Sequence, residues 1–432
     1  MSNLNLIPIG TLFDLEKGSL QSSKCTEGEY IFITAAQEWK THNEYSHECE
    51  ALIFAAAASG SLGRTHYIND KFITSDLCFI LTPKDTRKYP INLKFYHFVF
   101  NSLKDEIVKN TKSGTSKESI NQSNLRNYEI PYFEIDKQNL WIDKLVNTKS
   151  IKEDLELELS NGQSLLKQLK QTILQEAIEG KLTEKYRAKN LDIGTAKELL
   201  EQIKTEKEKL VKDKKIKASK PLAPINEDEI PFDIPPNWEW CRLGDIANGF
   251  QYGTSTKSKI NGKIPVLRMG NIQNGRVLLE ELVYTDNKSE IEKYSIEYND
   301  LLFNRTNSRE LVGKTAIYSF QKKAIYAGYL IKYSMILSNS HYINYVMNSP
   351  FHYRWCAKVR SDAIGQSNIN ATKLQSYIVP LPPLEEQKEI VATIEKLFEI
   401  CDELESEINQ NKTTVDNLMA TVLKEAFGDE NV

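Results

Sequence analysis

The chain has 432 residues, of which 40% are hydrophobic and 26% charged, and its formal net charge is −4. This size indicates two or three domains with real hydrophobic cores. No apolar run approaches the ~18 residues of a membrane span, and the N-terminus has no basic region followed by an apolar stretch. Six scattered cysteines form no CxxC pair, so the sequence predicts a reduced cytoplasmic protein without a structural zinc.

Residues 1–137 are predicted to form a first globular domain, which carries a net charge of −2. Two polar loops interrupt its apolar stretches, "AASGSLGRTH" at 57–66 and "TKSGTSKES" at 111–119. Small and basic residues of this kind are typical of surface loops between strands. The domain is therefore expected to have exposed polar loops between its strands.

A long helix is predicted over residues 138–182, followed by a charged helical stretch and a Pro-rich linker over 183–235. The apolar positions of the charged stretch are sparse, which favours a solvated helix that leads into an extended connector.

A second globular domain is predicted over residues 236–382 and has a net charge of +7. A C-terminal helix is predicted over 383–427, and the segment 383–432 has a net charge of −9. A basic domain fits a polyanion surface, whereas an acidic helix repels phosphate and favours a protein partner.

The two halves of the chain repeat one another. Ile120, Leu125 and Pro131 match Ile369, Leu374 and Pro380 at a constant offset of 249. "LKQTILQEAI" at 169–178 matches "LMATVLKEAF" at 418–427 at the same offset, and "IPIGTLFDL" at 7–15 matches "CRLGDIANG" at an offset of 234. Each half therefore consists of one globular domain followed by one long helix.

Both helices carry an apolar seam that alternates steps of four and three residues, the pattern of a coiled coil. In the C-terminal helix it comprises Ile390, Ile394, Leu397, Cys401, Leu404, Ile408, Asn411, Val415, Leu418 and Val422. A shift of 249 gives a matching seam from Trp141 to Ile173, with Gly162 opposite the polar break at Asn411. The seams predict that the helices pack on each other, and exact pseudo-two-fold symmetry would make them antiparallel with the domains at opposite ends.

Catalytic patterns are missing from the sequence. "SRELVGKT" at 308–315 lacks the first glycine of a phosphate-binding loop, and Glu310 would face the phosphate. No GxGxxG, HExxH or GxSxG pattern occurs, nor does the Asn/Asp-Pro-Pro-aromatic motif of amino-methylation. A chain of this length without a catalytic constellation favours a binding function.

Three stretches resemble a known family. "PLPPLEEQKEIV" at 380–391, "IPPNWEWCRLGDI" at 234–246 and "ESINQSNLRNYEIP" at 118–131 are similar to the specificity (S) subunit of Type I restriction–modification systems. The duplicated domain-plus-helix layout resembles this family along essentially the full chain. The first half of the chain departs from the family pattern, because "PYFEIDKQNLW" at 131–141 lacks the PPLxEQ motif.

The resemblance implies an α+β fold with two mixed α/β target recognition domains, separated by two long helices packed as an antiparallel coiled coil with an internal pseudo-two-fold repeat. It also implies that each domain reads one half of a split double-stranded DNA target, while the helices space the halves and dock two methyltransferase (M) subunits. S-adenosylmethionine, ATP and Mg would serve the methyltransferase and restriction (R) subunits, so no cofactor, catalytic residue or metal ligand is expected in this chain.

The DNA-contacting residues are expected in polar loops that carry Arg, Lys, Asn, Gln or Ser, since these side chains bind phosphates and base edges. In the first domain the candidates are Ser59, Ser61, Arg64, His66, Lys112, Gly114, Thr115, Ser116 and Lys117. In the second domain they are Arg268, Asn271, Gln273, Arg305, Asn307, Arg309, Lys314, Gly365, Gln366, Ser367 and Asn368. Trp238 and Trp240 are expected to pack in the interior and not to stack on bases.

Three alternatives remain open at this stage. One is a non-catalytic coiled-coil scaffold without DNA affinity, and another is the specificity subunit of a related methyltransferase system that lacks restriction. The third is an enzyme, such as a fusion of restriction and methylation activities with a degenerate active site. DNA affinity that depends on salt would separate the scaffold from the DNA-binding alternatives.

Overall fold

The structure is a computed structural model that describes residues 5–57, 60–113 and 118–427. The chain divides into two compact units. The first unit comprises the residues up to Gly162 together with those from Glu407 onward, and the second comprises Gln163–Ser406. Each long helix contributes residues to both units.

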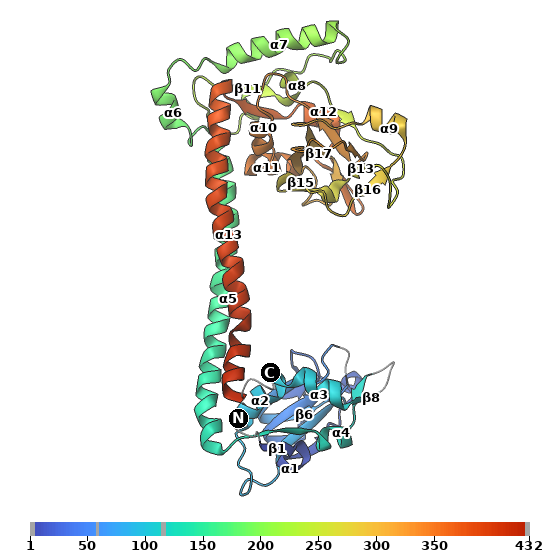
Figure 1. The fold of residues 1–432 in the computed structure, drawn as a ribbon, viewed down its shortest axis with the longest axis vertical. Coiled ribbons are helices and arrows are strands. Elements are labelled where there is room, and N and C mark those ends of the chain that lie inside the picture. Colours follow the sequence, from blue (N-terminus) through green and yellow to red (C-terminus); the bar gives the residue numbers. More distant parts are fainter. Residues whose placement is uncertain (1–4, 58–59, 114–117, 428–432) are drawn as a thin grey trace. The chain divides into compact units, whose positions relative to one another are not determined.

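A six-stranded sheet forms the centre of the first unit (Figure 1), in which β3 and β6 pair in parallel and the other neighbouring strands pair antiparallel. In spatial order the strands are β2 (Phe13–Lys17), β7 (Cys78–Pro83), β5 (His47–Ala55), β6 (Thr65–Thr74), β3 (Tyr30–Ile33) and β4 (Lys40–His42). The apolar run of β5 follows from burial on both faces, because Leu52 and Phe54 enter one hydrophobic cluster while Ile53 enters another.

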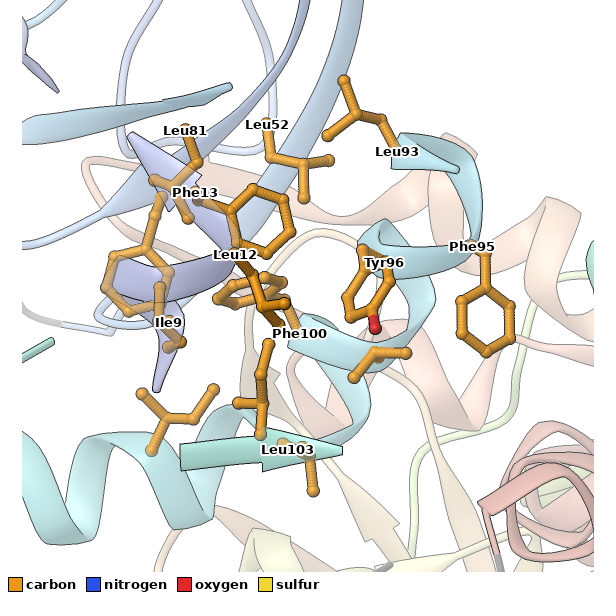
Figure 2. Packing of buried hydrophobic residues seen from close by; sticks show 14 of the residues in the cluster. Ile9, Leu12, Phe13, Leu52, Leu81, Leu93, Phe95, Tyr96, Phe100 and Leu103 are labelled. Atoms are coloured by element: carbon orange, nitrogen blue, oxygen red, sulfur yellow. The ribbon is translucent and has the colours of Figure 1, made fainter. Parts of the chain in front are cut away.

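Helix α2 (Leu93–Ser102) packs against β5 and β6, and α3 (Lys104–Thr111) follows it. Figure 2 shows Phe13, Tyr96 and Phe100 among the aliphatic side chains of this core. The ring of Phe13 meets the edges of Tyr96 and Phe100 at centroid distances of 5.5 and 5.7 Å. This packing fixes α2 on the sheet.

The second unit also has a six-stranded sheet, together with two three-stranded sheets. The large sheet runs in the order β12 (Gln251–Tyr252), β21 (Leu330–Tyr333), β17 (Leu301–Asn304), β19 (Thr315–Ile317), β15 (Gly275–Val277) and β14 (Ile272–Gln273). The small sheets are β16 (Val283–Thr285), β13 (Ile264–Leu267) and β20 (Ile325–Tyr326), and β18 (Thr306–Asn307), β23 (Gln366–Asn368) and β22 (Ser361–Ala363). Helices α9 (Lys288–Lys293), α10 (Ser340–Val346) and α11 (Pro350–Val359) complete the unit.

The sequence repeat is visible in the framework of both units. Strand β1 (Asn5–Pro8) pairs with β10 (Glu129–Tyr132), as β11 (Glu239–Arg242) pairs with β24 (Ile378–Leu381). Leu6 lies opposite Pro131 in the first pair and Trp240 lies opposite Pro380 in the second, so the register is the same. The short helices α1 (Ile9–Leu12) and α4 (Gln122–Asn127) correspond to α8 (Leu243–Ile246) and α12 (Ala371–Gln375).

Two long helices follow these strands, α5 (Ile135–Ile178) and α13 (Leu384–Phe427), and each has 44 residues. They run antiparallel in each unit. In the first unit, Lys144 pairs with Glu425 at 2.6 Å, and Gly162 faces Ile408. In the second unit, Lys170 pairs with Asp402 and Glu405, both at 2.8 Å. The fold class predicted from the sequence is confirmed in these features.

Nearly half of the predicted seam positions are buried, including Leu145 and Ile173 of α5 and Ile390 and Ile394 of α13, and most of the others are half-buried. Leu169 and Leu404 are exposed, with 45% and 42% of their surfaces accessible, and so is the polar break at Asn411. The α5 helix begins three residues earlier than predicted and ends four residues earlier. Among the described residues, no helix is long and apolar enough to cross a membrane.

The segment between the halves is more ordered than predicted. It contains α6 (Glu184–Lys189), α7 (Ala196–Lys212) and the 3₁₀ turn Glu227–Glu229. The prediction of a solvated helix was wrong for one face of α7, since Leu199 and Ile203 are buried. Lys207 donates from Nζ to the carbonyl oxygen of Gly244 at 2.5 Å, which ties α7 to α8.

Candidate nucleic-acid interface

The loop between β17 and β19 and the β22–β23 hairpin form one surface of the second unit. Thr306 and Asn368 pair between β18 and β23, and Asn368 Nδ2 donates to Thr306 Oγ1 at 2.7 Å. The backbone N–H of Ile369 donates to the carbonyl oxygen of Arg305 at 2.9 Å. Two of the predicted loops, which are about 60 residues apart in sequence, therefore lie side by side.

Two arginines on this surface share one carboxylate, and we call Arg309, Arg360 and Asp362 the arginine–aspartate cluster. Arg309 Nε lies 3.2 Å from Asp362 Oδ2, and Arg360 Nε lies 3.2 Å from Asp362 Oδ1. Ser367 donates from Oγ to Asp362 Oδ1 at 2.5 Å. This hydrogen bond and the two guanidinium groups hold the pKa of the Asp362 carboxyl below its usual value. The cluster has a net charge of +1 and is partly exposed.

Arg305 has a fixed orientation. Its guanidinium carbon lies 4.8 Å from the ring centroid of Tyr252, and its Nη1 donates to the carbonyl oxygen of Gly328 at 3.5 Å. The Tyr252 hydroxyl accepts the backbone N–H of Ala371 at 2.9 Å, so the stacking ring is itself held. Arg305 Nε is buried without a partner among the described residues. A preorganised guanidinium of this kind suits bidentate contact with guanine.

The base of the β17–β19 loop is held by buried contacts. Gly313 has a φ of +95°, and a Cβ built there would lie 2.3 Å from Cys356 Sγ. His352 Nε2 lies 2.9 Å from the Gly313 carbonyl oxygen, and burial lowers the pKa of His352 to about 4. Lys314 donates from Nζ to Gln273 Oε1 at 2.8 Å. This packing leaves Gly313 no room for a larger residue.

The β14–β15 region differs from the sequence-based expectation. Asn271 is buried, and its side chain accepts the N–H of Arg268 and donates to the carbonyl oxygens of Leu278 and Glu280. This amide shapes the loop and its hydrogen-bonding atoms are occupied. Arg268 donates from Nη2 to the Glu281 carbonyl oxygen at 2.8 Å and is exposed.

The tip of the β22–β23 hairpin is exposed. Gly365 has a φ of +79°, in the left-handed region that glycine adopts without strain. Gln366 is exposed beside it, while Ser367 is fully buried and bonds to Asp362. Asn307 is half-buried on β18. Gln366 is therefore free to contact a ligand, whereas Ser367 supports the hairpin.

In the first unit, the β5–β6 loop carries Arg64, whose Nη1 donates to the carbonyl oxygen of Ala35 at 3.1 Å and to Ser61 Oγ at 3.2 Å. His66 lies on β6, where its Nδ1 accepts the indole N–H of Trp39 at 3.3 Å. Burial lowers the pKa of His66. Trp39 is 41% exposed, so this edge offers an aromatic side chain beside two polar groups.

The hairpin β8 (Lys112–Ser113) and β9 (Ser119–Ile120) lies 249 residues before the β22–β23 hairpin. The bridge between Ala57 and Ser119 corresponds to the pair of Thr306 and Asn368 at the same offset. Lys112 pairs with Glu118 at 2.8 Å. The remaining candidates lie outside the described residues: Ser59, Gly114, Thr115, Ser116 and Lys117.

Both units therefore join a strand-connecting loop to a hairpin at matching positions. The sequence-based reasoning missed Asp362, Arg360 and Tyr252, which contact the predicted residues. Asp362 stands just before "AIGQSN", so extending that loop into a hairpin would have found it, whereas no local signal marks Tyr252. In the part of the chain that the structure describes, no group of three His, Cys, Asp or Glu residues has the arrangement of a metal site.

Comparison with known proteins identifies a family. The model of the Type I restriction modification DNA specificity domain matches residues 1–161 and 235–411. The chain is 32% identical to the Type I restriction enzyme EcoEI specificity subunit and 34% identical to that of EcoAI, both from Escherichia coli. Each match covers 57% of this chain but only 42% of the relative's length. The EcoDI specificity subunit of the same organism is 22% identical over 98% of this chain and 88% of its own.

Solved structures share the fold along the whole chain. A chain in a structure of the type I R-M system superposes with a TM-score of 0.70 at 15% identity, with 99% of both chains covered. The HsdS subunit from Thermoanaerobacter tengcongensis gives a TM-score of 0.55 at 15% identity, over 99% of this chain and 98% of that one. Because the family model covers well over half of its residues, the chain belongs to the Type I restriction modification DNA specificity family.

Proposed function

We propose that this chain is the specificity subunit of a Type I restriction–modification complex. Each globular domain reads one half of a bipartite double-stranded DNA target. The observation that carries the proposal is the pairing of a strand-connecting loop with a hairpin at matching positions of both units. A target with two half-sites needs two recognition domains, and the repeated framework supplies one domain for each half-site.

The contacts divide by physical role. Arg305 and Arg309, with Gln366, would reach base edges or phosphates from the second unit, and Arg64 and Lys112 would do so from the first. Guanidinium groups give sequence discrimination when they pair bidentately with guanine, while lysines on phosphates add affinity that falls with salt. The net charge of +7 over residues 236–382 supports DNA as the ligand of that domain.

The long helices would set the gap between the half-sites and dock two methyltransferase subunits. The acidic C-terminal segment, with a net charge of −9 over 383–432, supports a protein and not a DNA contact there. Leu140 and Leu165 of α5 are 72% and 64% exposed, and apolar side chains in water favour cover by a partner.

Catalysis would belong to other subunits in the cytoplasm. Methyl transfer from S-adenosylmethionine would take place in the methyltransferase subunits, and ATP- and Mg-dependent cleavage in restriction subunits. The sequence supports this division because it lacks the motifs of methyl transfer and nucleotide hydrolysis. A related complex that lacks restriction would use this chain in the same way.

The test is methylome sequencing of a strain that carries the chain with its methyltransferase subunit. We expect one bipartite motif with a fixed gap, and no methylation or ATP hydrolysis by the purified chain alone.

A heptad inserted beside Gly162 keeps the seam in phase and lengthens α5 by ~10 Å, so the gap between the half-sites should grow by up to about three base pairs. A continuous motif, or altered half-sites with an unchanged gap, contradicts the proposal.

A coiled-coil scaffold without DNA makes the opposite prediction. It would show no salt-dependent affinity for duplex DNA, with or without the methyltransferase subunit. Binding to a labelled duplex pool at two salt concentrations separates the two functions.

A further inference from the structure

One buried glutamine occupies the same place in both units. Gln138 lies in the first turn of α5 and Gln387 in the first turn of α13, at the repeat offset of 249. Both side chains are 0% exposed. A buried primary amide has two donors and one acceptor oxygen to satisfy, so its partners define the site.

The amide of Gln387 joins α13 to the globular part of the second unit. Its Oε1 accepts the backbone N–H of Asn339 at 2.8 Å and the hydroxyl of Ser338 at 2.9 Å. Its Nε2 donates to the carbonyl oxygen of Pro382 at 2.8 Å. Asn339 is also the N-cap of α10, because its side chain accepts the N–H groups of His341 and Tyr342.

Gln138 makes the equivalent contacts in the first unit. Its Oε1 accepts the backbone N–H of Asn92 at 2.7 Å, and Asn92 is the N-cap of α2. Its Nε2 donates to the carbonyl oxygens of Phe133 at 2.6 Å and Pro90 at 2.9 Å. Phe133 and Pro382 are again 249 residues apart.

A second pair of hydrogen bonds supports the same junction. Tyr96 of α2 donates from its hydroxyl to the carbonyl oxygen of Pro131 at 3.2 Å, and Tyr342 of α10 donates to that of Pro380 at 2.8 Å. In each unit, the chain passes from the last strand into the long helix within two residues. A link of two residues does not by itself fix the angle of the helix. Apolar packing holds each helix against its domain, with Ile142 and Leu145 of α5 in the first core and Phe398 of α13 against Tyr345, and the glutamine adds a directional hydrogen-bonded connection.

On the basis of the proposed function, we propose that Gln138 and Gln387 are positioning residues that set the angle between each recognition domain and its helix. They touch no DNA, and they act through the helix caps Asn92 and Asn339. A helix of 44 residues is ~66 Å long at ~1.5 Å per residue. A rotation of ~5° at one end displaces the other by ~6 Å, nearly two base pairs at ~3.4 Å each. Loss of one of these glutamines therefore weakens the preference for a single gap length between the half-sites and leaves the recognised half-site sequences unchanged.

The two junctions are not equally reinforced. Glu386 is fully buried and accepts from Thr183 Oγ1 at 2.7 Å, Arg187 Nη1 at 2.6 Å and Trp238 Nε1 at 2.9 Å. The matching position in the first unit is Lys137, which lies over the ring of Phe133 at 4.7 Å. The second junction thus has a buried carboxylate tie that the first lacks, and the Gln138 variant should have the larger effect.

The experiment uses the full chain in complex with its methyltransferase subunits. Gln138→Met and Gln387→Met remove the hydrogen bonds at similar side-chain size, and Gln168→Met and Gln410→Met make the same change at exposed positions of α5 and α13. Each complex methylates a duplex library with fixed half-sites and varied gaps. We expect wild type and controls to favour one gap, and the two junction variants to methylate neighbouring gaps with the same half-sites. An unchanged gap preference in a folded junction variant overturns the proposal.

A second measurement needs no DNA. Exchange of the Asn92 amide proton in Gln138→Met, and of the Asn339 amide proton in Gln387→Met, should accelerate about tenfold, because each amide loses its acceptor. If the wild-type complex shows no bipartite motif while this exchange accelerates, the proposed function fails and the junction contacts stand.

If the Met variants do not fold, Gln→Glu at the same sites is the alternative. It keeps the acceptor oxygen and removes the donors, and it should partially broaden the range of gaps that the complex methylates. A folded Glu variant with wild-type gap preference and exchange overturns the proposal.

Discussion

Removing the carboxylate of the arginine–aspartate cluster should change how the second unit responds to salt. Asp362→Asn keeps an oxygen that accepts the Ser367 hydroxyl but raises the local charge from +1 to +2. Arg309 and Arg360, with side chains 65% and 24% exposed, would no longer be paired with an anion. We expect both guanidinium groups to become available to phosphates.

The magnitude follows from counterion release. Each added phosphate contact steepens the slope of log K against log salt by ~0.9, so two contacts steepen it by ~1.8. Between 50 and 200 mM salt, the affinity of the variant for duplex DNA should therefore fall about twelvefold more than that of the wild type. At low salt, the variant should bind random-sequence DNA more tightly, which lowers its specificity ratio.

Fluorescence anisotropy titrations of specific and random duplexes at three or four salt concentrations measure both quantities. Asp286→Asn is the matched control, because it removes the same formal charge from the ion pair with Lys259 elsewhere in the second unit. A slope for Asp362→Asn equal to that of the wild type, or equal to that of the control, would show that the cluster does not face DNA phosphates.

Three further changes probe other contacts. Arg305→Ala removes a guanidinium held over Tyr252, so it should weaken the binding free energy for the specific duplex by about 1–3 kcal/mol. It should also relax the sequence of one half-site in the methylation motif, and two unchanged half-sites would exclude Arg305 as a residue that contacts bases. Arg187→Ala leaves the buried Glu386 carboxylate without its cation, and should lower the free energy of unfolding in urea by about 3–5 kcal/mol; a loss below 1 kcal/mol would refute this. Burial holds the pKa of His352 at about 4 against ~6.5 in the unfolded chain, so its contribution to stability is complete above pH 6.5 and declines by about 3 kcal/mol as the pH falls toward 4. His352→Gln should remove that part of the pH dependence of the urea midpoint, and identical pH profiles for variant and wild type would contradict it.

The framework of the protein could be predicted because its signals are local in sequence. The heptad seam gives the two long helices, and the constant offset of 249 gives their equivalence. Antiparallel pairing followed from assuming two-fold pseudosymmetry, and it is confirmed by ion pairs such as Lys144–Glu425 and Lys170–Asp402. Helix hydrogen bonds join residues four apart, so periodicity alone carries this information.

The motif at the start of each long helix shows what a comparison of motif residues alone can miss. The first copy lacks the two prolines and Glu386, which made its junction look different. Gln138 nevertheless keeps the hydrogen bonds of Gln387, because the amide acts on backbone groups that any residue supplies. What differs is the tie of Glu386 to Arg187, for which Lys137 offers no substitute.

By itself, the sequence determined the duplicated domain-plus-helix organisation, the helix seam and the polar loops that are candidates for DNA contact. Only the tertiary structure decided which of those loops meet, that Asp362 joins Arg309 to Arg360, and that Asn271 is buried in support of its own loop. The physical reason is the range of the interactions. Helix periodicity is written in neighbouring residues, whereas strand pairing and the partners of buried polar groups are chosen across tens to hundreds of residues by which backbones come together in the core.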